Sequence, residues 1–406
     1  MAEPTTDCTT ILPKELWDRC IDVLERDPSS LSALTRTCRT FHPRSRYLLY
    51  KLFRLDLRRE KTLNEFLTAI RDDDPRLATY VRILQLGQYS LDGKHPWHYR
   101  VPVALCASTT NLYTLIMHNL RVFHPDFLNY VTLFRGVGSL ELHNGIFDRF
   151  TDLVRMLLKF RNLESLTLRY VSWYGIKGLK QLIGPSLSKG FKLRSLSVAT
   201  LSFWNDDLVD LVDWLLTTPT TNALESLHAT CPGTENCIAL GRLIASCTSS
   251  LRQLEIVVEE DIYSTFKPEE HINSLNSIVI TENIYITRLR LQHVHVSYIP
   301  SLLTFLANAP PQIEQLYLNI RGPAALLSAA SFGELDTLIA TSVTFQRVRK
   351  AGVMIQRGQL SRDTYATESW LYDVVDKIAV QAWFPKLHEK GILAEFNLYK
   401  MWHGRH

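Results

Sequence analysis

Two histidines are the residues whose spacing comes closest to a metal site. His293 and His295 are separated by one residue in a segment that reads as a strand, so both side chains can lie on one face. Zinc sites in proteins use three or four protein ligands. Because no third His, Cys or carboxylate is identifiable nearby, we predict surface histidines and no metal site.

Other signatures of catalysis are absent from the sequence. It contains no GxGxxG or Walker loop, no GxSxG nucleophile motif and no HExxH zinc motif. The seven cysteines are irregularly spaced and form no CxxC, which argues against a disulfide framework and favours a reducing compartment. We therefore expect a non-enzymatic protein without catalytic residues, metal or cofactor, located in the cytoplasm or nucleus.

Composition and charge exclude further classes. The chain has 406 residues, of which 46% are hydrophobic, and its 45 Lys+Arg against 41 Asp+Glu give a net charge of +4. No run of five like charges occurs, so we predict no nucleic-acid partner. Residues 291–313 lack charged side chains but contain Pro300, Pro310 and Pro311, so we predict no membrane span.

The strands and helices that position the polar residues follow from an internal repeat. The pattern Leu-x-x-Leu-x-Leu, with other aliphatics allowed, recurs through most of the chain. The segments between copies carry apolar residues at helical spacing, for example Leu153, Val154 and Leu157. Each unit therefore predicts a strand followed by a helix, and neighbouring units must stack to bury their apolar faces. The copies begin at Leu52, Val81, Leu112, Val137, Leu163, Leu193, Leu224, Leu251, Ile286 and Ile313.

This repeat resembles that of leucine-rich repeat proteins. The resemblance implies an α/β fold in which residues 51–356 form a right-handed solenoid, with parallel strands inside and helices outside. Residues 357–406 are expected to form a C-terminal helical cap and tail. The slot that usually holds Asn or Cys carries an aliphatic residue here, as at Leu120, Val171 and Val294. The alternative is an ordinary α/β protein with coincidental leucine spacing.

The residues between the core leucines are the candidate binding residues. Side chains alternate along a strand, so these positions face the open side of the sheet, which solenoids use for binding. An equally favoured alternative is that Glu255 only pairs with Arg288 or Arg290 on a neighbouring strand. The candidate substrate face comprises Glu141, His143, Arg169, His228, Glu255, Arg288, Arg290 and Tyr317.

Residues 11–50 do not fit the repeat and form a separate helical module, preceded by a flexible N-terminus at 1–10. The module opens with Leu12-Pro13-x-Glu15-Leu16, and it continues through Leu-x-x-Leu to Cys-Arg-x-aromatic. It resembles an F-box, in which Cys20 and Thr37 replace the usual Ile and Val. The resemblance implies that the module binds a Skp-family adaptor through Leu12, Pro13, Leu16, Ile21, Leu24, Leu31, Leu34, Cys38 and Phe41.

An F-box followed by irregular leucine-rich repeats resembles the large fungal family of F-box proteins. The family implies the substrate-recognition subunit of a Skp–cullin–F-box ubiquitin ligase. The F-box would dock on the adaptor, and through it on cullin, while the repeats bind the protein to be ubiquitinated. Two alternatives remain. The helices can be a plain cap on the repeats, packed entirely against them, or the chain can be a repeat scaffold without a link to ubiquitination.

Overall fold

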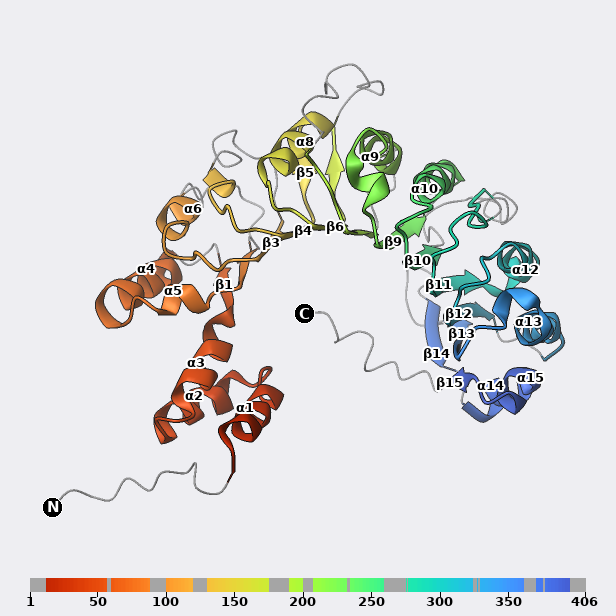
Figure 1. The fold of residues 1–406 in the computed structure, drawn as a ribbon, viewed down its shortest axis with the longest axis horizontal. Helices are drawn as coiled ribbons and strands as arrows, with labels where there is room; N and C mark the ends of the chain where they lie inside the picture. Colours follow the sequence, from red (N-terminus) through yellow and green to blue (C-terminus); the bar gives the residue numbers. More distant parts are fainter. Residues whose placement is uncertain are drawn as a thin grey trace. The chain divides into compact units, whose positions relative to one another are not determined.

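The chain forms two compact units, Met1–Leu163 and Glu164–His406 (Figure 1). The structure is a computed structural model. It describes residues 12–56, 60–87, 100–119, 130–174, 190–199, 207–231, 234–258, 275, 277–323, 327, 329–360, 370–374 and 377–394. The predicted flexible segment 1–10 lies outside the described residues.

Three helices with their own small core begin the first unit. They are α1 (Lys14–Val23), α2 (Pro28–Thr37) and α3 (His42–Lys51). Pro13 is extended ahead of α1, with φ −56° and ψ 147°, as a proline lead-in favours. The core consists of Ile21, Leu31 and Leu48, with Leu24, Leu34 and Phe41 among the residues packed around it. This three-helix module therefore buries apolar side chains among its own helices.

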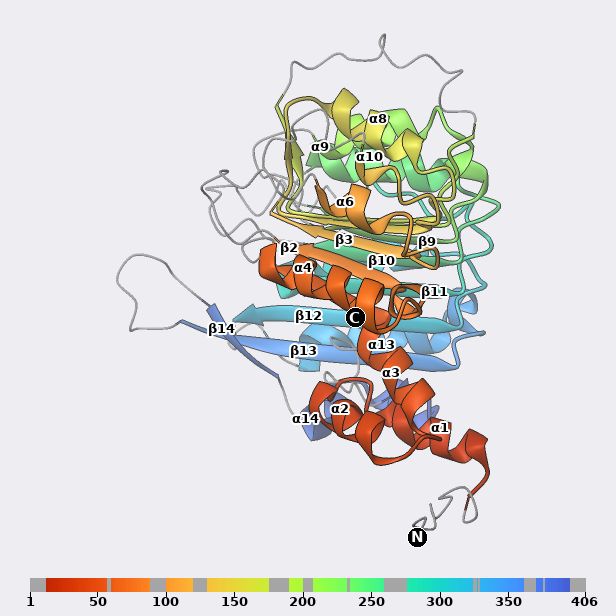
Figure 2. The same cartoon turned by 90° about the vertical axis from the view of Figure 1, so that its left-hand side faces the viewer.

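Helix α3 connects the three-helix module to the rest of the first unit. Arg46 on α3 forms an ion pair with Asp74, 2.9 Å apart, and Tyr47 packs edge-on against Tyr80. Figures 1 and 2 show α1 and α2 at the end of α3 that lies away from β1 (Leu52–Asp56). The module is thus joined to the strands mainly through one helix.

The strands of the first unit run parallel in chain order. β1 pairs with β2 (Ile83–Gly87), β2 with β3 (Thr114–His118), and β3 with β4 (Ser139–His143). The other elements of this unit are α4 (Glu60–Thr68), the π-helix η2 (Ala69–Asp73), α5 (Leu77–Tyr80), α6 (Arg100–Leu105), β5 (Ile146–Phe147) and α8 (Phe150–Lys159).

The second unit repeats the arrangement over more strands. β6 (Ser165–Arg169), β8 (Ser195–Ala199), β9 (Ser226–Cys231), β10 (Gln253–Val258), β11 (Arg288–His295), β12 (Gln315–Pro323) and β13 (Lys350–Leu360) pair in parallel in that order. Helices α9 (Asp207–Leu215), α10 (Thr234–Ser246), α12 (Ile299–Ala307) and α13 (Ala329–Thr341) lie on one side of these strands (Figure 1). Short elements complete it: β7 (Ser172–Trp173) and the 3-10 turns η5 (Pro219–Asn222), η6 (Val296–Tyr298) and η8 (Val343–Phe345).

These elements confirm the α/β class and the parallel strands. Exposure alternates along β3, β4, β6 and β8, with buried residues at the repeat positions and half-buried residues between them. This alternation follows from the period of two in a strand. The apolar repeat positions therefore form the core, and the intervening side chains form the opposite face of these strands.

The register corrects two details of the repeat. Phe53 pairs with Leu84 and Leu55 with Leu86, so the first copy is centred two residues earlier than the Leu52 start predicts. At the other end Leu316 pairs with Ala351, which reveals an additional copy over residues 348–353. Sequence inspection missed this copy because alanine occupies a leucine position.

A left-handed residue follows each of β3, β4 and β6, and another, His293, lies within β11. Asn119, Asn144, Tyr170 and His293 have φ between 53° and 58° at the same position of the repeat. Asparagine tolerates this conformation better than most residues with a side chain. Val171 and Val294, the aliphatic residues that follow Tyr170 and His293, are buried. The aliphatic residue that replaces the usual Asn or Cys therefore packs in the core, one residue after the left-handed position.

The C-terminal segment is only partly helical, which corrects the predicted helical cap over 357–406. β13 extends to Leu360, pairs antiparallel with β14 (Trp370–Val374) and parallel with β15 (Leu393–Ala394). The predicted helical content is present as α14 (Lys377–Trp383) and α15 (Pro385–Glu389). Figure 2 shows β14 beside the C-terminal ends of β12 and β13. Residues 395–406 lie outside the described part of the chain.

The buried Asp336 on α13 holds the start of α15. Its carboxylate oxygens accept hydrogen bonds from the backbone N–H groups of Lys386 and Leu387, both at 3.0 Å. Asp336→Ala leaves both groups without this acceptor, and we expect it to lower the free energy of unfolding by about 2 kcal/mol. Urea denaturation and hydrogen exchange over 377–390 measure this effect. The exposed Glu334→Ala on the same helix is the control, and equal losses for the two variants would contradict the capping role.

Among the described residues, no helix has the length and apolar character needed to cross a bilayer.

Candidate functional site

Helix α1 exposes apolar side chains on its outer side. Leu16 is 42% exposed, Val23 is 82% exposed, and Cys20 between them is also exposed. Spacings of four and three residues place these side chains along one face of a helix. We call Leu16, Cys20 and Val23 the outer stripe. Apolar side chains that lie together on the surface of a soluble protein mark an interaction site.

The three-helix module is held together beneath this stripe. The Arg44 guanidinium on α3 donates two hydrogen bonds to Asp22 on α1, at 2.6 and 2.7 Å, and this contact raises the pKa of Arg44. The rings of Trp17 and Phe41 pack 4.9 Å apart between centroids. These contacts fix α1 on α3, so the stripe is formed before any partner binds.

The residues predicted to bind the adaptor divide into three groups by their exposure. Leu16 and Pro13 are exposed, and Leu12, Leu24, Leu34, Cys38 and Phe41 are half-buried. Ile21 and Leu31 are only 3% and 1% exposed, so in the free chain these two belong to the core and do not form part of the surface of the module. Sequence analysis did not single out Val23, although its position seven residues after Leu16 was the available signal. Cys20 and Thr37 are exposed, so their substitutions alter the surface and not the packing.

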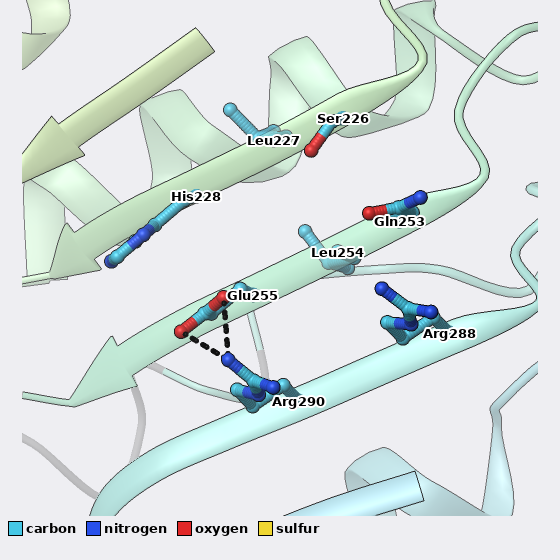
Figure 3. A pocket seen from close by; sticks show the side chains of 8 residues that line it. All are labelled: Ser226, Leu227, His228, Gln253, Leu254, Glu255, Arg288 and Arg290. Atoms are coloured by element: carbon cyan, nitrogen blue, oxygen red, sulfur yellow. Dashed lines mark hydrogen bonds and ion pairs between the residues drawn. The ribbon is translucent and has the colours of Figure 1, made fainter. Parts of the chain in front are cut away.

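In the second unit, the side chains that alternate with the core residues of β6–β13 form the polar face. Within it, Ser226, His228, Gln253, Glu255, Arg288 and Arg290 line a shallow pocket (Figure 3). These six come from the neighbouring strands β9, β10 and β11. The predicted residues His228, Glu255, Arg288 and Arg290 are thus brought together.

Glu255 is the charged centre of this pocket. Nη1 of Arg290 lies 3.3 Å from both of its carboxylate oxygens, drawn as dashed lines in Figure 3, and the Gln292 amide donates to it as well. Arg288 instead donates from Nε to the Gln315 amide oxygen at 3.0 Å. The structural alternative of cross-strand pairing therefore holds for Arg290 and not for Arg288.

Tyr317 on β12 lies beside two cations, Arg290 of the pocket and Lys350 of β13. Its ring has the Arg290 guanidinium 5.2 Å from its centroid and the Lys350 ammonium 5.9 Å away. Lys350 was missed by sequence analysis because it belongs to the repeat copy in which alanine hides the pattern. We call Arg288, Arg290, Tyr317 and Lys350 the cationic corner.

The remaining predicted residues lie elsewhere. Arg169 on β6 faces Ala199 of β8 in the register, outside the pocket. Glu141 and His143 are on β4 of the first unit, where His143 Nε2 lies 3.3 Å from Glu141 Oε2. The His143 ring also packs 4.5 Å from that of His118, whose pKa is lowered by burial and by His143.

The regular strand that would let His293 and His295 share a face is interrupted at His293. The register of β11 and β12 shifts between Leu291 and Val294, and His293 adopts the left-handed conformation there. His295 Nδ1 accepts a hydrogen bond from the backbone of Ser297. No group of three or more potential metal ligands occurs among the described residues.

His293 makes the stability of the fold depend on pH. Burial, and then the charge of Arg321, lower the pKa of His293 to about 4 from 6.5. As the pH falls from about 6.5 to about 4, the unfolded chain binds this proton before the folded chain does, so stability decreases in that window. His293→Asn suits the backbone and removes the titration, which should reduce this slope by up to about 1.4 kcal/mol per pH unit. Urea denaturation across the window measures the slope, and an unchanged slope would contradict the assignment.

Comparison with known proteins gives no match: no family model matches the chain, and no curated protein does.

Proposed function

We propose that this chain is the substrate-recognition subunit of a Skp–cullin–F-box ubiquitin ligase. In this proposal the three-helix module is an F-box that binds a Skp-family adaptor, and the strands and helices that follow are a right-handed leucine-rich repeat solenoid that binds the cargo. The observation that carries the proposal is the outer stripe of Leu16, Cys20 and Val23. It lies on helix α1, which begins within Leu12-Pro13-x-Glu15-Leu16.

The two faces of α1 differ in what they contact. Its inner face contributes Ile21 to the core, while its outer face leaves Leu16 and Val23 in solvent. A helix that only capped the repeats would turn its apolar side chains toward them. Burial of Leu16 and Val23 against a partner would remove this apolar surface from water, which is the main driving force of such association.

The three-helix module and the polar face would bind the two different partners of a recognition subunit. The adaptor, and cullin through it, would bind the outer stripe of the first unit. Cargo would bind the polar face of the second unit, on side chains that the core does not use. The chain would perform no covalent chemistry itself, and it would act in the cytoplasm or nucleus.

A repeat scaffold without a link to ubiquitination is the second candidate. It is favoured by the contacts of α3 with Asp74 and Tyr80, which tie the module to the rest of the unit as a cap would be tied. The two functions differ in what happens at the outer stripe. A scaffold has no requirement for a partner at Leu16 and Val23.

Assembly with purified components separates the candidates. The full chain, a Skp-family adaptor and the N-terminal half of a cullin are mixed and resolved by size-exclusion chromatography. We expect one ternary complex that contains all three proteins. Separate elution of a folded chain from a preformed adaptor–cullin complex would favour the scaffold.

A further inference from the structure

Two strands, β11 and β13, place cations on the polar face on either side of β12. In the register, Arg288, Gln315 and Lys350 share one row across β11, β12 and β13, and Arg290 and Tyr317 are neighbours in the next row. Parallel strands are spaced about 4.8 Å apart, so the backbones of Arg288 and Lys350 lie about 10 Å apart. Gln315 and Tyr317 occupy the space between these two cations.

The positive charge of this corner is only partly neutralised. Glu255 pairs with Arg290. Arg288 donates to a neutral amide, Lys350 lies against a ring, and neither has a carboxylate partner among the described residues of the second unit. Two cations therefore face solvent across the Tyr317 ring.

Two buried polar atoms beside Tyr317 lack partners within the described structure. They are Nε of Arg290 and Oδ1 of Asn319, whose side chain is 4% exposed. Asn319 follows Tyr317 by two residues and so lies on the same face of β12. Buried polar groups are normally hydrogen-bonded. Arg290 Nε is a donor and Asn319 Oδ1 is an acceptor, and neither is satisfied within the described structure.

We propose that the cationic corner binds an acidic peptide segment of the cargo, with its negative charges held between Arg288 and Lys350 and its backbone beside Tyr317. This inference rests on the proposed function, because it assigns the cargo site of the recognition subunit. The negative charge can come from phosphorylated side chains or from clustered Asp and Glu carboxylates, both of which form strong charge-assisted hydrogen bonds with Arg and Lys.

A nucleic-acid strand fits the corner poorly. Its phosphate backbone requires an extended basic stripe. Here Glu255 stands within the pocket on the adjacent strand β10, and β8 and β9 beyond it carry Ser195, Ser197 and Ser226. The cations of the corner are thus bordered by acidic and neutral side chains, which suits a short acidic segment better than an extended phosphate backbone.

Fluorescence anisotropy with short labelled peptides tests the inference. The peptides share a Gly/Ser scaffold that carries phosphoserines, glutamates or unmodified serines, and an oligo-dT strand serves as the polyanion control. We expect the full chain to bind the phosphoserine or the glutamate peptide more tightly than the serine peptide. The Arg288→Gln/Lys350→Gln variant should lose about tenfold or more of that affinity.

The matched control is Arg252→Gln/Arg349→Gln, which removes the same charge from exposed residues that each precede a strand of this sheet. It should bind the acidic peptides like the wild type. The inference is overturned if no acidic peptide binds the wild type, if both double variants bind equally, or if oligo-dT binds more tightly than the peptides. Adaptor binding is measured on the same samples. If adaptor binding is lost while peptide binding is intact, the proposed function alone is refuted. If adaptor binding is intact and any of the overturning results is obtained, this inference alone is refuted.

Discussion

Replacing both Leu16 and Val23 with alanine should weaken binding of a Skp-family adaptor several-hundred-fold without unfolding the chain. Both side chains are exposed on the outer stripe, so the substitutions remove little from the core. A buried interface anchor contributes about 2 kcal/mol, and two such losses correspond to a factor of several hundred. Alanine favours helix, so α1 should persist. Calorimetric titration measures the affinity, and circular dichroism reports the helix content.

Ile21→Ala is the matched control for this pair. Ile21 lies on the same helix but in the core with Leu31 and Leu48, so its truncation should destabilise the module by about 2–4 kcal/mol. Loss of adaptor binding by this variant should therefore come with loss of helical structure. If the Leu16/Val23 variant remains folded and binds the adaptor as the wild type does, the outer stripe is not the docking surface.

Leu289→Ala should destabilise the second unit by about 3–5 kcal/mol. Leu289 is 0% exposed and pairs in the register with Leu254 on one side and Leu316 on the other. The alanine would leave a cavity at the centre of a stack in which each strand supports its neighbours. Urea denaturation followed by circular dichroism measures the loss.

Arg288→Ala is the adjacent control, since its side chain lies on the polar face and makes one hydrogen bond to Gln315. We expect it to change the free energy of unfolding by less than about 1 kcal/mol. Similar losses in the free energy of unfolding for Leu289→Ala and Arg288→Ala would show that the core face and the polar face are not distinct. That result would contradict the assignment of Leu289 to the core and Arg288 to the polar face.

The sequence predicted the α/β class and the parallel strands well because one periodicity determines them. Alternation between a core leucine and a polar residue makes the face of each strand residue readable, as the exposure pattern of β10 shows. The pattern failed where a small residue replaced a leucine, at Ala351, and where several apolar residues offered two frames, at Leu52 and Phe53. It also missed β14, which pairs antiparallel and follows no repeat.

The candidate sites were less predictable than the strands. Leucines occur on both faces of the N-terminal helices, so composition alone did not separate Ile21 in the core from Leu16 on the surface. In the polar face the pairing of Glu255 with Arg290 instead of Arg288 depends on the register, which puts Glu255 and Arg290 directly opposite. Both distinctions come from tertiary contacts, and a periodic pattern does not encode them.

The central claim is that the three-helix module docks on a Skp-family adaptor, and a calorimetric titration of the full chain with purified adaptor tests it most directly. Hydrogen exchange of the complex locates the contact. We expect saturable binding of one adaptor per chain, with new protection from hydrogen exchange concentrated in α1 around Leu16 and Val23. A folded chain that releases no heat and gains no protection in α1 at saturating adaptor would contradict it.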